Sequence, residues 1–309
     1  MATHIVEPER KTLHGHFSRD LPPALTIDSG DTVIFRTLDA GWTVEQPASV
    51  DDTPKKFEPR VEALDGGHSL CGPVAVSGAQ PGMTLEIGIE AIQVGTWGWG
   101  GSYRGDRNEK LDVPNEGKYE LFWELDSEEG TGRSQHGHTV ALKPFMGVMG
   151  MPPADPGIFS TGPPRNSGGN LDCKELVAGT TLFLPIPVPG ALFSVGDGHA
   201  IQGDGEVSGV AIECPMEKVE LTFKLRDDLT LSAPRVRVEG GWLTLGLHED
   251  LNEATFLALK AMLDLMCEQM DMGRKEALAL ASLVVDMRIT QIVNGTCGVH
   301  AFLADGALK

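Results

Sequence analysis

Glycine and proline interrupt this sequence too often for long helices over most of its length. The chain of 309 residues holds 38 glycines and 20 prolines, and both residue types favour turns over continued helix or strand. Between the interruptions, apolar and polar residues alternate, as with Leu85, Ile87 and Ile89 against Glu86 and Glu90. Alternation of this kind indicates half-buried strands, so the sequence predicts a β-rich body.

The alternating pattern recurs along the first 250 residues. It predicts two strands within Leu25–Thr37, separated by a turn at Asp28–Asp31, and further strands at Met83–Val94, Lys118–Leu125, Thr139–Leu142, Thr180–Val188, Leu192–Val195, Val207–Glu213, Val219–Leu225, Val236–Val238 and Trp242–Leu247. Two segments, Gly95–Glu116 and Met146–Asp172, follow no period. We expect the first to be a long loop and the second to be irregular chain that wraps the core or lines a pocket.

The pattern becomes helical at Asn252. Apolar side chains then fall on one helix face, with Asn252 as the expected cap and Gly273 as the stop; they are Leu259, Met262, Leu263, Met266 and Met270. A second helix is predicted at Lys275–Met287 and a short closing strand at Ile289–Val293.

This change divides the chain into two predicted parts. Residues 1–250 would form a β-rich catalytic body, and residues 251–309 a helical hairpin and closing strand packed on it. The expected fold is therefore mainly β, with an α+β C-terminal portion that includes the hairpin.

The net charge argues against nucleic acid and anionic membranes as partners, and the cysteine pattern indicates the cellular compartment. A formal net charge of −19 would repel nucleic acid and anionic membranes, and no apolar stretch approaches the roughly 18 residues of a membrane span. The N-terminal segment has no apolar core of a secretory signal, and the five cysteines are dispersed without a CxxC pair. We therefore expect a cytoplasmic protein with reduced thiols.

The segment GDGHAIQGDGE, residues 196–206, is the strongest candidate for chemistry. Asp197 and His199 are two residues apart, so on an extended chain they point to the same face. Asp204 and Glu206 repeat that spacing after a glycine turn. Three carboxylates and an imidazole suit a divalent metal of the zinc class. The alternative is an Asp-Gly hairpin turn with a hydrogen-bonded histidine.

Other side chains could join this group. The further metal-ligand candidates are the pairs His14/His16 and His136/His138, together with His68 and Asp39. Nucleophilic catalysis has less support, because no G-x-S-x-G elbow is present and Cys173 follows the acidic Asp172.

Several motifs resemble the acetamidase/formamidase family. They are PPALTIDSGDTVIFRTLDAG from Pro22, GPVAVSGAQPGMTLEI from Gly72, PFMGVMGMPP from Pro144, GGNLD from Gly168, LFLPIPVPGALFSVGDGHAIQGDGE from Leu182 and ITQIVNGTCGVHAFL from Ile289. The resemblance covers nearly the whole chain. It implies a β-sandwich body, hydrolysis of short linear amides such as formamide and acetamide, bound metal ions, and a homodimer or higher homo-oligomer.

The resemblance also implies roles for particular residues. Asp197, His199 and Glu206 match the family motif, and His14, Asp39 and His68 match it less closely. Met83 stands where relatives often have an acidic residue. The Trp97–Trp99 segment and the His136/His138 pair have no aligned counterpart.

Together these observations predict a metal-assisted amidase acting on a small neutral amide. The expected metal ligands are Asp197, His199, His68, Asp39 and His14, and zinc is expected before calcium. Glu206 and Asp204 would transfer protons. Asn170 and Met149 would lie in the wall of the substrate pocket. A thiol-dependent amidase and a non-catalytic binding protein on the same fold are the alternatives.

Overall fold

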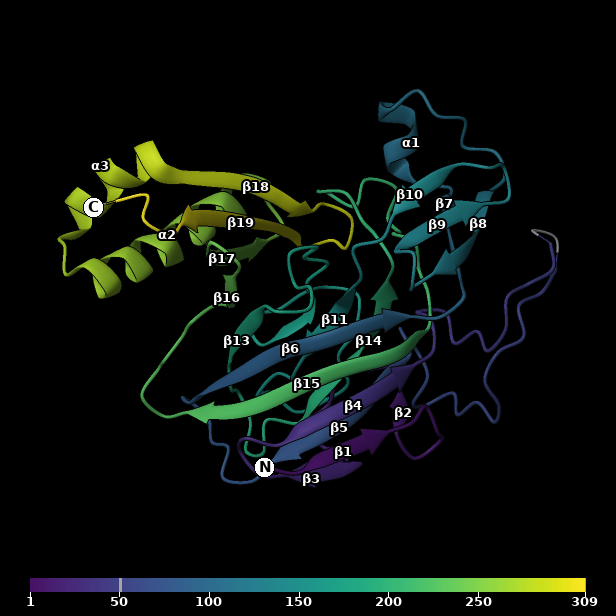
Figure 1. The fold of residues 1–309 in the computed structure, drawn as a ribbon, viewed down its shortest axis with the longest axis horizontal. Coiled ribbons are helices and arrows are strands. Elements are labelled where there is room, and N and C mark those ends of the chain that lie inside the picture. The colour runs from purple at the N-terminus through teal and green to yellow at the C-terminus, as the bar shows by residue number, and fades with distance from the viewer. Residues whose placement is uncertain (50–51, 309) are drawn as a thin grey trace.

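A computed structural model of the chain describes residues 1–49 and 52–308. Its largest sheet has nine strands, in the order β1 (Thr3–Val6), β4 (Thr32–Thr37), β15 (Met216–Arg226), β6 (Thr84–Val94), β13 (Thr181–Pro185), β16 (Arg235–Val238), β17 (Gly241–His248), β19 (Cys297–Ala304) and β18 (Val285–Gln291). Figure 1 shows these strands running from the N-terminal edge of the molecule to the C-terminal helices.

Two smaller sheets complete the β structure of the described residues. One has the order β12 (Gly168–Asn170), β11 (Phe145–Gly150), β14 (Phe193–His199), β5 (Leu70–Val76) and β2 (Leu13–His14), with β3 (Leu25–Ile27) pairing parallel to β5. The other has the order β10 (Thr139–Ala141), β9 (Thr131–Ser134), β8 (Tyr119–Asp126) and β7 (Trp97–Ser102). The helices are α1 (Asp106–Lys110), α2 (Leu251–Met270) and α3 (Arg274–Val284).

The main core lies between the largest sheet and the sheet that contains β14. Phe223 of β15 meets Phe193 of β14 edge to face, with ring centroids 5.1 Å apart. Ile87 of β6 and Met149 of β11 are fully buried in the same apolar cluster. Apolar side chains of both sheets thus share one core, and the predicted mainly β fold is confirmed.

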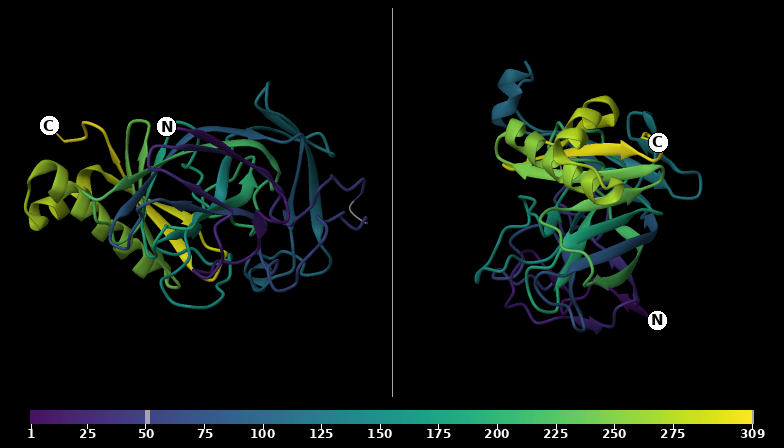
Figure 2. Two further views of the ribbon diagram at one scale, coloured as in Figure 1. Left: turned by 90° about the horizontal axis from the view of Figure 1, so that it is seen from below. Right: turned by 90° about the vertical axis from the view of Figure 1, so that its left-hand side faces the viewer.

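The helical hairpin packs on the C-terminal strands of the largest sheet. α2 lies against β17 and β19 and can come close because Gly246 has no side chain: a Cβ there would lie 2.0 Å from the Ala254 carbonyl oxygen. A separate apolar cluster, which includes Met262 and Val299, fills this contact. Figure 2 shows the hairpin at one end of the molecule. The division at residues 250 and 251 stays a prediction, since β17 and β19 pair within one sheet.

The bounds of the hairpin differ from the prediction. The carboxylate of Asp250 caps α2 by accepting hydrogen bonds from the backbone N–H groups of Asn252 and Glu253, so the helix begins before the expected cap. The second helix ends at Val284, and the chain continues directly as β18. β18 pairs with β19, a strand that the sequence did not predict.

Two predictions for the middle of the chain are wrong, and a third is right in part. Gly95–Glu116 contains strand β7 and helix α1. Met146–Asp172 includes strand residues of β11 and β12, but residues 151–167 are irregular and Asn170 lines a pocket, as expected. Glycine-rich strands lack the alternation that marks ordinary strands, which explains why these strands were not predicted. Val207–Glu213 is not a strand but a loop, because Gly205 and Gly209 have positive φ angles and turn the chain there.

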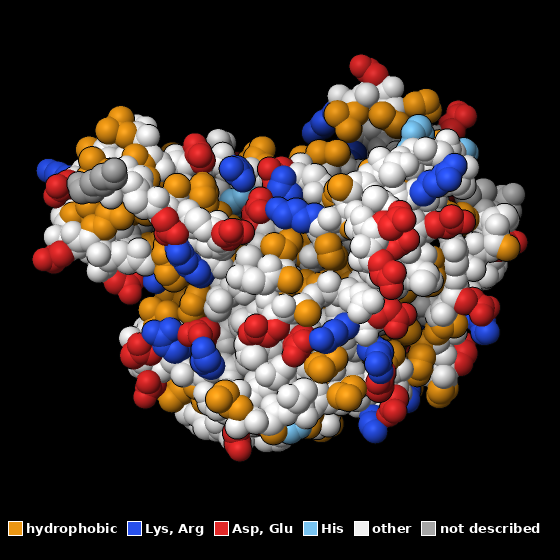
Figure 3. Space-filling view, in the orientation of Figure 1, with side chains coloured by type: hydrophobic (Ala, Val, Ile, Leu, Met, Phe, Trp, Pro, Cys, Tyr) orange, Lys and Arg blue, Asp and Glu red, His pale blue; other side chains and the backbone are white. Residues whose placement is uncertain are grey.

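The surface has a hollowed edge. Figure 3 shows a depression between the end formed by α2 and α3 and the end that carries α1, with acidic and basic side chains intermingled over the visible face. Among the described residues, no helix has the length and apolar character needed to cross a membrane.

Candidate active site

Five titratable side chains converge where β14 ends. Asp197 and His199 belong to β14, Asp172 follows β12, and Glu206 and Glu213 lie on the loop that leaves β14. His199 Nε2 lies 3.2 Å from Glu213 Oε2 and 3.4 Å from Asp197 Oδ1. Ligand atoms of Asp172, His199 and Glu206 also lie within 4.8 Å of one another. All five residues are buried.

The backbone beneath three of these carboxylates is unusual. Asp172, Asp197 and Glu206 have φ angles of 46°, 59° and 47°, in the left-handed region that residues other than glycine seldom adopt. Each such residue costs of order 1–3 kcal/mol, and such conformations collect at active sites and ligand clamps. The local chain is thus bent at three points that aim carboxylates at one place.

Gly147 of β11 makes room for the group. A Cβ atom at this position would lie 2.6 Å from Asp197 Oδ2, 2.8 Å from His199 Cε1 and 2.9 Å from Asp172 Oδ1. These distances are too short for any side chain. The glycine therefore explains how two carboxylates and an imidazole can crowd over one strand.

The glycines of β7 position Glu213. The backbone of Glu213 exchanges two hydrogen bonds with that of Trp99, with N···O distances of 2.7 and 2.9 Å. On either side of Trp99, a Cβ at Gly98 would lie 2.9 Å from the Glu213 carbonyl oxygen, and one at Gly100 would lie 2.5 Å from that of Ala211. The Gly-Trp-Gly alternation thus lets the loop lie directly on β7, which holds Glu213 beside His199.

Burial and mutual charge shift the pKa values of the group in opposite directions. Burial raises the pKa of Glu206 and that of Glu213 to about 7. Burial and the charge of Glu206 raise the pKa of Asp172 well above its usual range. Burial would also raise the pKa of Asp197, but His199 outweighs it and the pKa is lowered. Burial would lower the pKa of His199, but Glu213 and Asp197 raise it well above the usual value.

Unpartnered polar atoms gather at the same place. In the described chain, 11 buried side-chain nitrogen and oxygen atoms have no hydrogen-bond partner, and seven of these belong to the group or its neighbours: His68 Nδ1, Asn170 Oδ1, Asp172 Oδ1, both ring nitrogens of His199, Glu206 Oε2 and Glu213 Oε2. His199 Nε2 is close to two carboxylates but lacks hydrogen-bond geometry. Buried polar atoms are normally paired, so this concentration marks a site for a ligand.

A cavity of about 210 Å³ opens onto the group. Its polar walls are formed by His68, Asn170, Asp197, Glu206, Glu213 and Asn294. Asn294 comes from the loop between β18 and β19 and donates a hydrogen bond of 2.6 Å to Asp172 Oδ2. The cavity thus combines residues from both ends of the chain.

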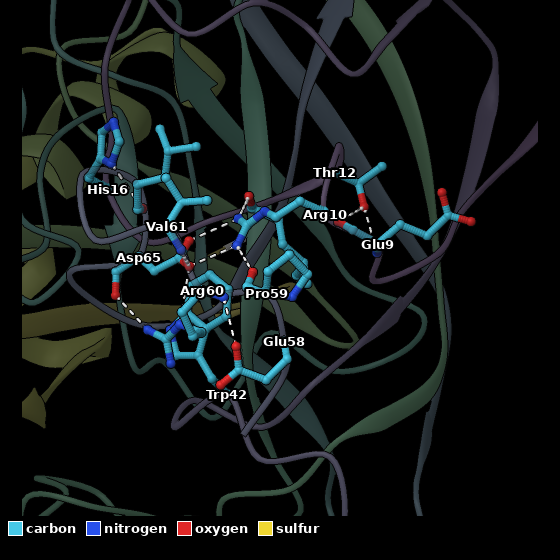
Figure 4. A network of polar contacts seen from close by, with 12 residues as sticks. Glu9, Arg10, Thr12, His16, Trp42, Glu58, Pro59, Arg60, Val61 and Asp65 are labelled. Atoms are coloured by element: carbon cyan, nitrogen blue, oxygen red, sulfur yellow. Dashed lines mark hydrogen bonds and ion pairs between the residues drawn. The ribbon is translucent and has the colours of Figure 1, made fainter. Parts of the chain in front are cut away.

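An ion-pair network fixes the loop that carries His68 (Figure 4). Arg10 donates hydrogen bonds of 2.7 and 2.8 Å to the two carboxylate oxygens of Asp65, and Arg60 donates a third of 3.1 Å. The Arg60 guanidinium lies 4.2 Å from the centre of the Trp42 ring. Trp42 Nε1 in turn donates to the carbonyl oxygen of Gly67. The network therefore anchors the chain directly before His68.

The structure places several predicted residues away from the cavity. His14 bonds the His16 carbonyl oxygen and the Ser194 hydroxyl, and Met149 is buried in the main core. Asp39 lies beside the cavity, but its oxygens accept hydrogen bonds from Trp99 Nε1 and the Thr43 backbone. Burial raises the pKa of Asp39.

Asp204 belongs to a different group of side chains. It forms an ion pair with Lys174 at 3.1 Å and lies close to Glu175 and His300. Glu206 is only two residues further along the chain. The turn between them sends the two carboxylates to different places, because the chain is not extended here as the sequence interpretation assumed.

Three site residues were missed by sequence reasoning. Glu213 was placed at the end of a predicted strand, Asp172 was considered only as a neighbour of Cys173, and Asn294 received no role. The alternating glycines of β7 were the one local signal for Glu213, since they indicate close backbone approach. Asp172 and Asn294 reach the cavity through tertiary contacts alone.

The family model described as acetamidase/formamidase matches residues 2–158 and 157–239, which together span well over half of the chain. This protein belongs to the acetamidase/formamidase family. The resemblance inferred from the motifs is thereby confirmed.

Solved structures of acetamidase/formamidase proteins share the fold over nearly the whole chain. An acetamidase from Bacillus halodurans is 28% identical, with a TM-score of 0.82 over 97% of each chain. A predicted acetamidase/formamidase from Thermoanaerobacter tengcongensis is 25% identical, with a TM-score of 0.86 over 99% of this chain and 97% of that one. The acetamidase of Mycolicibacterium smegmatis is 25% identical over 255 residues, which is 63% of this chain and 61% of that relative. The match thus spans less than two thirds of the Mycolicibacterium protein.

Proposed function

We propose that this acetamidase/formamidase family member hydrolyses the C–N bond of small linear carboxamides, releasing ammonia and a carboxylate. The observation that carries the proposal is the convergence of four carboxylates and an imidazole, several with unpartnered atoms, at the edge of a small cavity. Family membership supports the same chemistry.

The donor set fits a divalent metal ion. Asp197, His199 and Glu213 form one buried set of potential ligands, and Asp172, His199 and Glu206 form another. So many buried carboxylates around one imidazole leave uncompensated negative charge, which a cation would balance. Imidazole nitrogen with carboxylate oxygen suits zinc, whereas calcium prefers oxygen ligands throughout. A bound metal would polarise the amide oxygen and bring the pKa of water toward neutral.

Glu206 is the proposed proton carrier. Its Oε2 has no hydrogen-bond partner and lies where it can accept a proton and give the proton up again, and burial raises its pKa to about 7 before a metal ion binds. It takes a proton from the attacking water as the new C–O bond forms, and it delivers that proton to the amide nitrogen as the C–N bond breaks. The nitrogen therefore leaves as ammonia and not as an amide anion.

Neighbouring residues would hold the reacting groups. Asn170 Oδ1 has no partner in the cavity wall and is suited to accept an N–H of the substrate amide. Asn294 and Gln202 fix Asp172 through its Oδ2 and its backbone carbonyl oxygen. The space of about 210 Å³ favours an uncharged amide of few atoms at this position.

A thiol-dependent mechanism has less support. Burial raises the pKa of Cys71 and that of Cys173 to about 12, and it raises the pKa of Cys214 further. A thiolate is the nucleophilic form, so these thiols are poorly activated at neutral pH. Membership of the acetamidase/formamidase family favours an enzyme over a non-catalytic binding protein on the same fold.

Ammonia release from formamide and acetamide tests the proposal, with elemental analysis of the purified protein. We expect stoichiometric divalent metal and turnover that chelation abolishes and added metal restores, while alkylation of the thiols leaves turnover intact. Full activity in exhaustively chelated, folded protein would remove the metal from the mechanism. We also expect a cytoplasmic homodimer or larger homo-oligomer, which light scattering of the purified protein would measure.

A further inference from the structure

A second hollow adjoins the catalytic cavity. It has a volume of about 400 Å³, and its walls share Gly41, Trp99 and Val210 with the cavity that holds Glu206 and Glu213. The two spaces therefore meet at these three residues. The second hollow lies between the loop before β5, strand β7 and strand β8, and includes the Trp99 segment for which the sequence resemblance gave no counterpart.

Aromatic and other apolar side chains dominate the walls of this outer hollow. They are Pro47, Pro54, Trp99, Tyr103, Phe122 and Val210. Trp99 and Tyr103 pack edge to face, with ring centroids 6.4 Å apart. Trp99 is fixed by its hydrogen bond to Asp39, and the Tyr103 hydroxyl lies 3.3 Å from Glu120 Oε1. Both rings are thus held in place by hydrogen bonds to carboxylate groups.

The charged groups around the outer hollow already have partners. Lys118 pairs with Glu120 at 2.8 Å, and Lys56 donates hydrogen bonds to the Gly41 carbonyl oxygen and the Thr43 hydroxyl. An acidic ligand would have to compete with these contacts. The outer hollow is therefore suited to an uncharged group.

The two volumes differ in what they can hold. Pockets for drug-sized ligands measure roughly 300–1,000 Å³. The catalytic cavity, at about 210 Å³, falls below that range, and the outer hollow, at about 400 Å³, falls within it. Formamide and acetamide would fill at most the inner space, so the aromatic walls outside would touch no part of them.

We propose that the outer hollow binds the aryl-bearing acyl group of an arylalkyl carboxamide, while the carboxamide itself lies in the catalytic cavity. This inference rests on the proposed amide hydrolysis and names the substrate class for it. A short alkyl chain would connect the two spaces along the walls that they share, at Gly41, Trp99 and Val210. The reaction is unchanged: water and the amide yield the arylalkanoic acid and ammonia.

Rates of ammonia release from acetamide, phenylacetamide and 3-phenylpropionamide test the inference on the metal-loaded protein. Burial of one aromatic ring in a preformed apolar pocket is expected to raise kcat/KM about 10- to 100-fold over acetamide. Phe122→Ala removes one wall without touching the catalytic group. It should lower kcat/KM for the phenyl substrates at least tenfold and change that for acetamide less than about twofold.

Phe256→Ala is the matched control, because Phe256 is an exposed phenylalanine on α2, in the other end of the molecule. This substitution should change kcat/KM neither for the phenyl substrates nor for acetamide. If thermal unfolding shows that Phe122→Ala does not fold, Tyr103→Ala replaces it. This variant too should lower kcat/KM for the phenyl substrates and leave that for acetamide nearly unchanged. Calorimetry adds a measurement without turnover: 3-phenylpropionate should bind wild-type protein at least tenfold more tightly than acetate.

The outcomes separate the inference from the function on which it rests. Turnover of acetamide that equals or exceeds that of the phenyl amides, or a Phe122→Ala defect shared by all three substrates, would overturn the substrate class and leave amide hydrolysis standing. No ammonia from any of the three amides would overturn both. If Phe122→Ala lowers kcat/KM for the phenyl amides but not for acetamide, and Phe256→Ala lowers neither, the result supports both the substrate class and amide hydrolysis.

Discussion

Asp65 and Glu206 are both buried carboxylates of the β body, but their surroundings stabilise the negative charge of Asp65 and destabilise that of Glu206. Burial alone would raise the pKa of Asp65, yet hydrogen bonds from Arg10 and the Val61 backbone lower it below the usual range. Burial raises the pKa of Glu206 to about 7, and its Oε2 has no hydrogen-bond partner. The charge of Asp65 is stabilised, and that of Glu206 is penalised.

The difference separates structural from functional burial of charge. A carboxylate held by two arginines contributes to folding, because each hydrogen bond to a charged group is worth about 1.5–3 kcal/mol. A carboxylate crowded among other carboxylates costs free energy in the absence of a cation. The second arrangement persists in a folded protein when the site binds something that supplies the missing charge.

Glu206→Gln should have the largest effect on catalysis. Loss of the proton carrier is expected to lower kcat for amide hydrolysis about a thousandfold. The metal-free variant should unfold at the same or a higher temperature, because the substitution removes a penalised charge. Ammonia-release rates and calorimetry of the metal-free protein measure the two effects. Retention of more than a tenth of the activity would contradict the role given to Glu206.

Asp65→Asn should have the opposite pattern of effects, with a large loss of stability. It removes the charge that pairs Arg10 with Arg60, so the free energy of unfolding should fall by about 3 kcal/mol in denaturant titrations. Glu9→Gln is the control, because its ion pair with Lys11 is exposed and should contribute less than about 1 kcal/mol. If the two substitutions lower the free energy of unfolding equally, the buried Asp65 network is no more stabilising than an exposed ion pair.

His14 offers a smaller test through pH. Burial lowers its pKa from 6.5 to about 4, among His16, Arg10 and Asp65. Above pH 6.5 the imidazole is neutral in both states. As pH falls toward 4, only the unfolded state takes the proton, so stability is lost. Between pH 7 and 5 the loss should be about 2 kcal/mol.

Denaturant titrations of wild-type protein and His14→Gln at both pH values isolate this term, since the other titrating groups are shared. At pH 7 the variant should be less stable than wild type, because it loses the contact with Ser194. Its free energy of unfolding should then fall less than that of wild type between pH 7 and pH 5. An identical pH dependence in the two proteins would show that His14 takes up its proton in the folded state.

Asp204→Asn should have the smallest effect. Its carboxylate pairs with Lys174 and is partly exposed, so kcat should change less than about twofold and stability by less than about 1 kcal/mol. The same assays as for Glu206→Gln apply. A loss of activity comparable to that of Glu206→Gln would mean that the two carboxylates act together, against the separation described above.

The sequence predicted the strands with regular alternation, because period two follows directly from the pleat of a half-buried strand. β6, β15 and β17 lie close to their expected bounds. It failed where close backbone packing replaces side-chain alternation, as in β7. It also placed the start of β18 at Ile289 and not at Val285, because this strand follows a helix without a break. Neither arrangement leaves a local pattern of apolar residues.

The candidate site could be predicted only as far as its local part. Asp197 and His199 were paired by spacing, and the structure places them side by side, with Asp197 and Glu206 in the cavity wall. Glu213 depends on the contact between a loop and β7, and Asp172 depends on the pairing of β11 with β12. Residues brought together by such contacts have no fixed separation in sequence, so no spacing rule could find them.

The hydrogen bond from Asn294 to Asp172 has a consequence for the order in which the protein becomes active. The proposed catalytic cavity draws on His68 early in the chain and on Asn294 close to its last strand. During synthesis the N-terminal sheets can begin to pack while the ribosome is still translating. The Asp172 carboxylate acquires its final orientation only after the β18–β19 loop has emerged, so a nascent chain can be largely folded and still lack a finished reaction centre.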